Sequence, residues 1–182
     1  VLDRSRELSP GRLVVIHGHG GDQVRSAQNA PDLRWALQSP QLGTGHAVAQ
    51  ALPELDDSQP TLILSGDVPL IGAATLRRLL AAAGSDKLAI LTVDMPDPTG
   101  YGRIVRDAKG IKAIVEHKDA DTATREIREI NTGIMVAPTR PLRRWLANLS
   151  NKNAQGEYYL TDIVAMAVVD GVPVTSAHPD HI

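Results

Sequence analysis

The chain has 182 residues, of which 42% are hydrophobic and 22% charged, and its formal net charge is −2. This length suits one well-filled core rather than two ordinary domains, and the small net charge argues against nucleic acid or an anionic membrane as a partner. Cysteine is absent, which excludes disulfides, thiolate metal sites and a cysteine nucleophile and fits a reducing cytosol, and no apolar run approaches the roughly 20 residues that span a bilayer.

The first half of the chain alternates short apolar runs rich in β-branched residues with segments of helical character. This alternation is typical of a parallel sheet with right-handed crossover connections. The clearest buried strand is predicted at 61–65. The expected elements, in chain order, are a helix end at 1–8, a strand at 13–17, a helix at 23–28, a strand at 34–37, a helix at 45–52, the strand at 61–65, a helix at 73–83 and a strand at 88–93.

The pattern changes in the second half, where the spacing favours a mixed arrangement. Two runs flank a turn near Lys109–Gly110, which is typical of an antiparallel hairpin. Thr161–Asp162 is predicted to cap a helix that runs to Val169. No linker or repeat divides the chain, so a single domain over 1–182 is expected. The further elements are strands at 104–106, 111–115, 129–136 and 172–175 and a helix at 142–149.

Gln38 ends a predicted strand, and the Gly43-Thr44-Gly45 loop that follows opens a helix. A side-chain amide carries both a donor and an acceptor, as the edge of uracil does, so Gln38 is suited to read that base. The two glycines would let the backbone approach a base or phosphate closely, and the helix start offers free N–H groups to phosphate. A glycine turn that merely joins strand to helix is an equal alternative.

Asp67 follows an apolar strand and Gly66, and it precedes Val68-Pro69-Leu70. Its carboxylate is expected at the C-terminal edge of the sheet, where open α/β folds place their ligands. Mg²⁺ is typically held by one or two carboxylates plus substrate phosphates. Asp67 is therefore predicted to bind magnesium; the alternative, a cap for the next helix, is disfavoured by the distance to that helix.

Other polar residues interrupt or follow the apolar runs. Asn131 and Gly133 stand inside an otherwise apolar strand, which modestly favours close approach of a ligand; close approach of backbone, with a hydrogen-bonded structural asparagine, is the alternative. For Gly102, in a glycine-rich turn, and for Glu116, in a charged stretch, an ordinary solvated loop is the commoner outcome. The polar and aromatic block at 153–162 suits either a pocket wall or an Asn-capped loop. The histidines show no metal-ligand spacing, and no Gly-x-Ser-x-Gly elbow is present.

Together these segments resemble the uridyltransferase domain of the bacterial bifunctional N-acetylglucosamine-1-phosphate uridyltransferase/glucosamine-1-phosphate acetyltransferase. Each motif is weak alone, but their order along nearly the whole chain makes the resemblance specific. The matching stretches are Gly18–Asp22, Leu37–Ala47, Gly66–Ile71, Asp97–Ile104, Ile114–Ala120, Glu129–Ile134 and Asn153–Ile163.

The resemblance implies a Rossmann-like nucleotide-diphospho-sugar transferase fold, a mixed, mainly parallel sheet flanked by helices. It implies a cytoplasmic, Mg²⁺-dependent enzyme that joins UTP and N-acetylglucosamine 1-phosphate to give UDP-N-acetylglucosamine and pyrophosphate, for peptidoglycan and lipopolysaccharide precursors. By matching position, the uridine part would lie on Gln38, Gly43 and Thr44; the ribose and phosphates along Ser65, Gly66 and Asp67, with Asp67 as metal ligand; and the amino sugar on Gly102, Glu116 and Asn131, with Glu157, Tyr159 and Thr161 lining the same pocket.

The sequence also departs from the family pattern. The family's first strand and its Leu-Ala-Ala-Gly-x-Gly-Thr-Arg-Met loop, which cradles the triphosphate, have no counterpart here, and the second metal ligand is expected beyond Ile182. The family's C-terminal left-handed β-helix, which carries acetyl transfer and trimerisation, is also missing. We therefore expect a partial domain with little turnover of its own, from a homotrimeric parent. The rival interpretations are a nucleotidyltransferase for another sugar phosphate or base, and a non-catalytic UDP-sugar-binding module.

Overall fold

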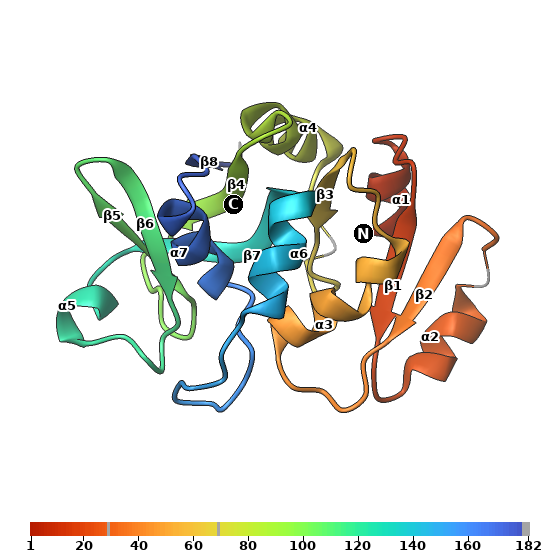
Figure 1. Ribbon diagram of the computed structural model, residues 1–182, viewed down its shortest axis with the longest axis horizontal. Helices are drawn as coiled ribbons and strands as arrows, with labels where there is room; N and C mark the ends of the chain where they lie inside the picture. The colour runs from red at the N-terminus through yellow and green to blue at the C-terminus, as the bar shows by residue number, and fades with distance from the viewer. Residues whose placement is uncertain (29, 69, 180–182) are drawn as a thin grey trace.

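A long central strand, β7 (Glu129–Pro138), organises the main sheet in the computed structural model, which describes residues 1–28, 30–68 and 70–179 (Figure 1). This sheet has six strands in the order β6-β5-β7-β4-β8, and β3 pairs with β7 beside that path. A separate parallel pair is formed by β1 and β2. The other strands are β1 (Leu13–His17), β2 (Leu33–Leu37), β3 (Pro60–Ile63), β4 (Leu88–Asp94), β5 (Arg103–Asp107), β6 (Gly110–Val115) and β8 (Val174–Ala177).

The prediction of a mixed α/β sheet is confirmed, but its mainly parallel character is wrong for the described pairs. Only β1–β2 and β4–β8 are parallel, whereas β3–β7, β4–β7, β5–β6 and β5–β7 are antiparallel. Strands β3 and β4 do run in the same direction, as a strand–helix–strand crossover requires. However, β7 lies between them and runs the opposite way. Local alternation shows the direction of successive strands and cannot show that a later strand lies between them.

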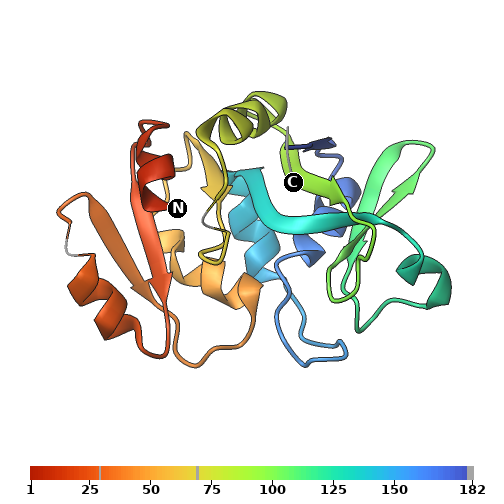
Figure 2. The same ribbon diagram turned by 180° about the vertical axis from the view of Figure 1, so that it is seen from behind.

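Helices cover both faces of this sheet. The cluster on one face joins the sheet to α3 (Thr44–Gln50), α6 (Thr139–Ala147) and α7 (Asp162–Val169), and the cluster on the other joins it to α4 (Ala73–Ala83). Figures 1 and 2 show α6 and α7 on one side of β7 from front and back. Leu88 and Ile90 of β4 belong to the first cluster, and the intervening Ala89 belongs to the second. Because successive strand side chains point to opposite faces, a strand covered on both is apolar throughout.

The predicted elements are confirmed to within a few residues at their ends, with one difference in burial. Strand β3 ends at Ile63 and is only partly buried, although the sequence favoured it as the clearest buried strand. It has a strand partner, β7, on one side only among the described residues. Short helices complete the chain: α1 (Leu2–Arg6), α2 (Gly21–Ala27), the 3-10 helix η1 (Leu52–Glu54) and α5 (Thr122–Arg125). None of the helices in the described ranges combines the length and apolar character needed to cross a membrane.

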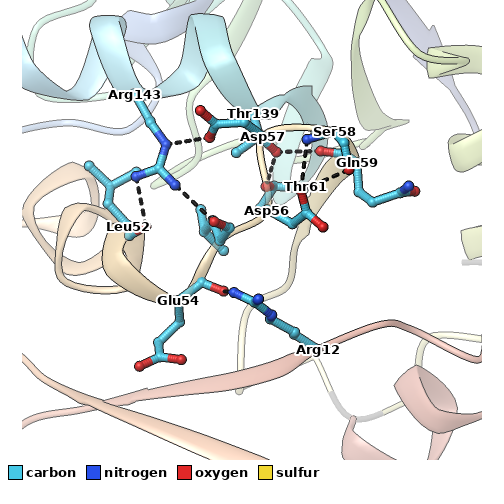
Figure 3. Close-up of polar contacts among 11 residues, drawn as sticks. Arg12, Leu52, Glu54, Asp56, Asp57, Ser58, Gln59, Thr61, Thr139 and Arg143 are labelled. Carbon is cyan, nitrogen blue, oxygen red and sulfur yellow. Dashed lines mark hydrogen bonds and ion pairs between the residues drawn. The ribbon is translucent and has the colours of Figure 1, made fainter.

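Arg143 of α6 anchors the loop that leads into β3 (Figure 3). Its guanidinium donates to the carbonyl oxygens of Leu52 at 2.7 Å and Leu55 at 2.8 Å, and to Asp57 Oδ1 at 2.6 Å. On the same helix, the Thr139 hydroxyl donates to the carbonyl oxygen of Gln59 at 2.6 Å. The carbonyl groups of Leu55 and Gln59 lie outside the helices and strands, so these contacts give them partners and fix where β3 starts. The position of the residues after β3 depends on this anchor.

Candidate functional site

Gln38 is held at the end of β2 with its side chain buried, 8% exposed. Its backbone N–H donates to the carbonyl oxygen of His17 at 2.8 Å, which ties it to the end of the parallel neighbour β1. Its side-chain Nε2 donates to the carbonyl oxygen of Gly43 at 2.9 Å and lies 3.1 Å from Nδ1 of His46. The predicted base-reading amide is therefore fixed by the loop that follows it.

Gly43 and Gly45 are required by packing against another part of the chain. Gly43 has a φ of +112°, and a Cβ built on it would stand 2.7 Å from the carbonyl oxygen of Tyr158. A Cβ on Gly45 would stand 2.3 Å from the Leu149 side chain. The sequence predicts that these glycines let a ligand approach closely. In the structure, residues 149–160 already occupy the space beside them.

The loop before α3 and the segment before α7 are joined along their backbones. Gly45 N–H donates to the carbonyl oxygen of Tyr158 at 2.8 Å, and Tyr158 N–H donates to that of Leu42 at 2.8 Å. The Thr44 hydroxyl oxygen accepts from the N–H of Leu160 at 3.0 Å. In both views these two loops, orange and blue, lie side by side below the sheet (Figures 1 and 2). Residues 42–45 and 158–160 thus form one wall.

The same segment also contacts Glu116, which follows β6. The hydroxyl of Thr161 donates to Glu116 Oε1 at 2.9 Å, and Gly102 lies so near that a Cβ on it would stand 3.3 Å from both carboxylate oxygens. The predicted capping role of Thr161 is wrong, because its side chain makes no cap hydrogen bond to α7 and is used on Glu116 instead. Glu116 is also not the solvated loop residue that its charged neighbours favoured, since it is partly buried.

Three carboxyl groups and a phenol gather at this end of the site. Burial raises the pKa of Glu116, with the charges of Asp119 and Asp162 adding to the effect. Burial also raises the pKa of Asp162, again with help from Asp119. The Tyr159 hydroxyl donates to Asp119 Oδ2 at 3.1 Å, and burial is the main cause of its raised pKa. Such a set offers hydrogen-bond acceptors to a ligand and is unsuited to binding an anionic group beside the carboxylates.

Asn131 links this cluster to the end of β3. Its backbone N–H donates to the carbonyl oxygen of Gly102 at 2.9 Å, and its side-chain Oδ1 accepts from Gly133 N–H at 3.1 Å. Gly133 has a φ of +79°, and a Cβ on it would stand 2.8 Å from the Ser65 hydroxyl oxygen. Gly133 therefore marks a close approach, as glycine inside a strand often does. The approaching group is the segment after β3.

Gly66 and Asp67 stand apart from these contacts and are exposed. Within the described residues no hydrogen bond or ion pair involves the Asp67 carboxylate, and no group of three or more His, Asp or Glu side chains is placed to hold a metal ion. One free carboxylate fits a cation whose other ligands come from substrate phosphates and water, as is common for Mg²⁺. It does not form a cage for a tightly held ion. Pro69, within the stretch Gly66–Ile71, lies outside the described residues.

The structure therefore brings most of the predicted residues into one continuous row. The row runs from the amide of Gln38 through Gly43 and Thr44 to residues 158–161, and from there through Glu116 and Gly102 to Asn131 and Ser65. Glu157 belongs to the joining segment, where its N–H and carbonyl group both bond to the Asn153 side chain, at 3.2 and 2.6 Å. Gly66 and Asp67 follow Ser65 at one end of the row.

Three residues of this region were missed by sequence reasoning. His46 contacts Gln38, and Asp119 supports both Tyr159 and the backbone N–H of Ala154, which donates to Asp119 Oδ1 at 2.9 Å. Arg103 is 1% exposed and donates to the carbonyl oxygen of Tyr101, next to Gly102. No periodic signal marks a histidine or an aspartate that supports another side chain, so these contacts became visible only in three dimensions.

One hollow on the described surface lies away from this row. It has a volume of about 580 Å³ and is lined mainly by polar residues around α1, β1 and β2, among them Arg6, Arg12 and Asp32. A second, of about 380 Å³, is lined by His17, Arg25, Trp35 and neighbouring glycines. Neither contains a residue of the row, so the row is identified by its chemistry and contacts rather than by cavity size.

Comparison with known proteins places these features in context. The MobA-like NTP transferase domain family matches residues 1–129. The chain is 65% identical over 182 residues to the "Bifunctional protein GlmU" of Herminiimonas arsenicoxydans, and 68% identical over 181 residues to that of Janthinobacterium sp. (strain Marseille). Each alignment covers 100% of this chain and 40% of the relative, so the chain spans less than half the length of these relatives.

Solved structures share the fold at much lower sequence identity. A Bacillus anthracis protein described as a glucose-1-phosphate thymidylyltransferase superposes with a TM-score of 0.70 at 14% identity, covering 98% of this chain and 72% of that one. A UDP-glucose pyrophosphorylase complexed with UDP-glucose superposes with a TM-score of 0.70 at 13% identity, covering 92% and 73%. These likenesses confirm the expected nucleotide-diphospho-sugar transferase fold.

Proposed function

Because the chain belongs to the MobA-like NTP transferase domain family, we propose that its row of site residues binds UTP and N-acetylglucosamine 1-phosphate for uridylyl transfer. The observation that carries the proposal is the continuous row itself, which has a buried amide at one end and a carboxylate with hydroxyl and amide neighbours at the other. The two ends have the different chemistries that a base and a sugar require. The products would be UDP-N-acetylglucosamine and pyrophosphate.

At the base end, Gln38 pairs with the uracil edge, and Gly43 and Thr44 hold the loop beside it. The contact of Gln38 Nε2 with the Gly43 carbonyl oxygen supports this role, because it presents the rest of the amide in one fixed orientation.

At the sugar end, Glu116 accepts hydrogen bonds from sugar hydroxyls, and Gly102 and Asn131 lie beside it. The Cβ test on Gly102 supports this role, since any larger residue there would come within 3.3 Å of the Glu116 carboxylate. Thr161 orients that carboxylate, while Tyr159 and Glu157 belong to the segment that walls the pocket.

Asp67 is the residue that would hold a divalent cation, together with Ser65 and Gly66 along the phosphates. A carboxylate without a protein partner in the described parts of the chain fits one ligand position of Mg²⁺. When bound there, the cation would supply charge neutralisation on the triphosphate.

The transfer needs no general base from this chain. The attacking oxygen belongs to the sugar phosphate and is already anionic at pH 7. It forms a bond to the α-phosphorus of UTP while the bond from that phosphorus to the bridging oxygen of pyrophosphate breaks. The task of the site residues is therefore to bind and align the two substrates, which is the main source of catalysis in phosphoryl transfer.

The test is pyrophosphate release from UTP and N-acetylglucosamine 1-phosphate by the natural protein at full length, with Mg²⁺ varied. Asp67→Asn should lower turnover at least a hundredfold and leave the melting temperature unchanged, whereas Asp86→Asn, an exposed carboxylate after α4, should retain wild-type turnover. If Asp67→Asn keeps its rate at low Mg²⁺, the metal assignment fails. Release with a different nucleotide or sugar phosphate would favour the sister enzymes, and UDP-sugar binding without release would favour a binding module.

A further inference from the structure

We infer that Arg103 is a positioning residue for the sugar end of the site, where it holds the peptide group between Tyr101 and Gly102 so that the Gly102 N–H can donate to the amino sugar. The inference deepens the proposed function and rests on it, because it assumes that the amino sugar lies beside Gly102. Arg103 itself is not among the residues proposed to touch a substrate.

Arg103 is a buried cation. Its side chain is 1% exposed, no ion pair involves it among the described residues, and its Nε has no hydrogen-bond partner. A guanidinium stays charged in proteins, and burying a charge without an opposite charge beside it is costly. The contacts that Arg103 does make therefore need a reason other than charge pairing.

These contacts join three segments around the sugar end. Nη1 of Arg103 donates to the carbonyl oxygen of Tyr101, in the turn before β5. Nη2 lies 3.4 Å from Nδ1 of His117, in the turn after β6, and 3.5 Å from the carbonyl oxygen of Arg125, the last residue of α5. One guanidinium thus connects the turn that carries Gly102 with the turn after β6.

Gly102 and Arg103 face opposite sides of the sheet. The N–H of Asn131 donates to the Gly102 carbonyl oxygen at 2.9 Å, so the pairing of β5 with β7 extends to Gly102. Successive side chains of a strand point to opposite faces, and a Cβ on Gly102 would stand 3.3 Å from the Glu116 carboxylate. Arg103 therefore acts from behind the sugar end.

The carbonyl group of Tyr101 and the N–H of Gly102 belong to one peptide group. This peptide is trans, so the two bonds point in opposite directions. Because the carbonyl oxygen is bonded to Arg103, the N–H points away from the guanidinium. Gly102 is buried, yet in the described part of the chain its N–H donates to no acceptor. Buried backbone donors are nearly always paired, so this N–H suits an acceptor on the ligand.

The test compares Arg103→Met, which removes every donor, with Arg103→Lys, which keeps a charge and a donor for one carbonyl oxygen. In the natural protein at full length, KM is measured separately for N-acetylglucosamine 1-phosphate and for UTP. We expect Arg103→Met to raise KM for the sugar phosphate about tenfold, as the loss of a charged hydrogen bond does, and to leave KM for UTP within about twofold of wild type. Arg103→Lys should raise KM for the sugar phosphate only about threefold, because an ammonium group lacks the fork that reaches several acceptors.

Leu79→Ala is the control for a general loss of stability, because Leu79 is fully buried in the cluster on the α4 side of the sheet. It should lower the melting temperature and leave the ratio of the two KM values unchanged. If Arg103→Met does not fold, Arg103→Lys is judged by the same ratio. An unchanged ratio in Arg103→Met, no recovery in Arg103→Lys, or the same change in Leu79→Ala would overturn the role of Arg103 alone. A wild-type protein that does not consume N-acetylglucosamine 1-phosphate would overturn the proposed function, and this inference with it.

Discussion

Replacing Gly43 by alanine separates the strain of a left-handed backbone from the clash of a close approach. Gly43 has a φ of +112°, and its added Cβ would stand 2.7 Å from the Tyr158 carbonyl oxygen and 2.9 Å from the Tyr158 nitrogen. Both are backbone atoms, which no side-chain rotation can move away. Gly156 is the matched control, because its φ is +68° and a Cβ there meets nothing within 4 Å.

The positive φ costs an alanine about 1–2 kcal/mol at Gly156 and about 1–3 kcal/mol at Gly43, whose ψ of 174° lies in a region that essentially only glycine adopts. Forcing a methyl group into occupied space adds about 1–3 kcal/mol at Gly43 only. Gly156→Ala should therefore destabilise by about 1–2 kcal/mol and Gly43→Ala by about 2–6 kcal/mol. In a domain of this size 1 kcal/mol moves the melting temperature by about 2–4 °C.

The melting temperatures of the two variants in the natural protein give this comparison directly, since contributions from the rest of the protein cancel. The Gly43 variant should also raise KM for UTP, because the displaced loop carries the hydrogen-bond partners of Gln38. Equal melting temperatures for the two variants would show that Tyr158 does not press on Gly43, and the wall formed by residues 42–45 and 158–160 would have to be abandoned.

Two further substitutions test the sugar end and the anchor of β3. Glu116 has a raised pKa, so it holds its proton more tightly in the folded state and lowers the free energy of unfolding as pH rises through the folded pKa. Glu116→Gln should therefore melt above wild type at pH 8, lose this advantage as the pH falls toward about 4, and raise KM for the sugar phosphate about tenfold. A melting temperature below wild type at pH 8 would contradict the burial argument. Arg143→Met removes the donors to Leu52 and Leu55 and should lower the free energy of unfolding by about 2–3 kcal/mol in thermal melts. The control is Arg140→Met, exposed on the same helix, which should stay within about 0.5 kcal/mol of wild type. Equal losses of stability in the two variants would show that Arg143 does not anchor the loop before β3.

The secondary structure was largely predictable because it depends on local patterns. The apolar run 88–93 is a strand buried on both faces, and the turn near Lys109–Gly110 does join a hairpin. Which strands are neighbours was not predictable in this way. The place of β7 between β3 and β4 depends on contacts between residues more than forty positions apart, such as Ile90 with Met135.

Which of the candidate residues lie together was predictable in part, but which side chains hold them in place was not. Family resemblance placed Glu116 and Thr161 in one pocket, and they are hydrogen-bonded across 45 positions. From local pattern alone, Thr161 suits a helix cap and Glu116 a solvated loop. Both interpretations failed for the same reason, because each side chain found its partner in the other. The roles of these residues toward a ligand stay predictions.

The segment that precedes α7 gives the row a property that neither of its ends has alone. Tyr158 is bonded to Leu42 and Gly45 at the base end, and Thr161 is bonded to Glu116 at the sugar end. The two residues between them are held in place, since Tyr159 and Leu160 are buried and the N–H of Leu160 donates to the Thr44 hydroxyl oxygen. A displacement at Gly43 must therefore reach Glu116 through a backbone that cannot absorb it. Alanine at Gly43 should thus raise KM for the sugar phosphate as well as for UTP, whereas a change confined to UTP would mean that the two ends are held independently.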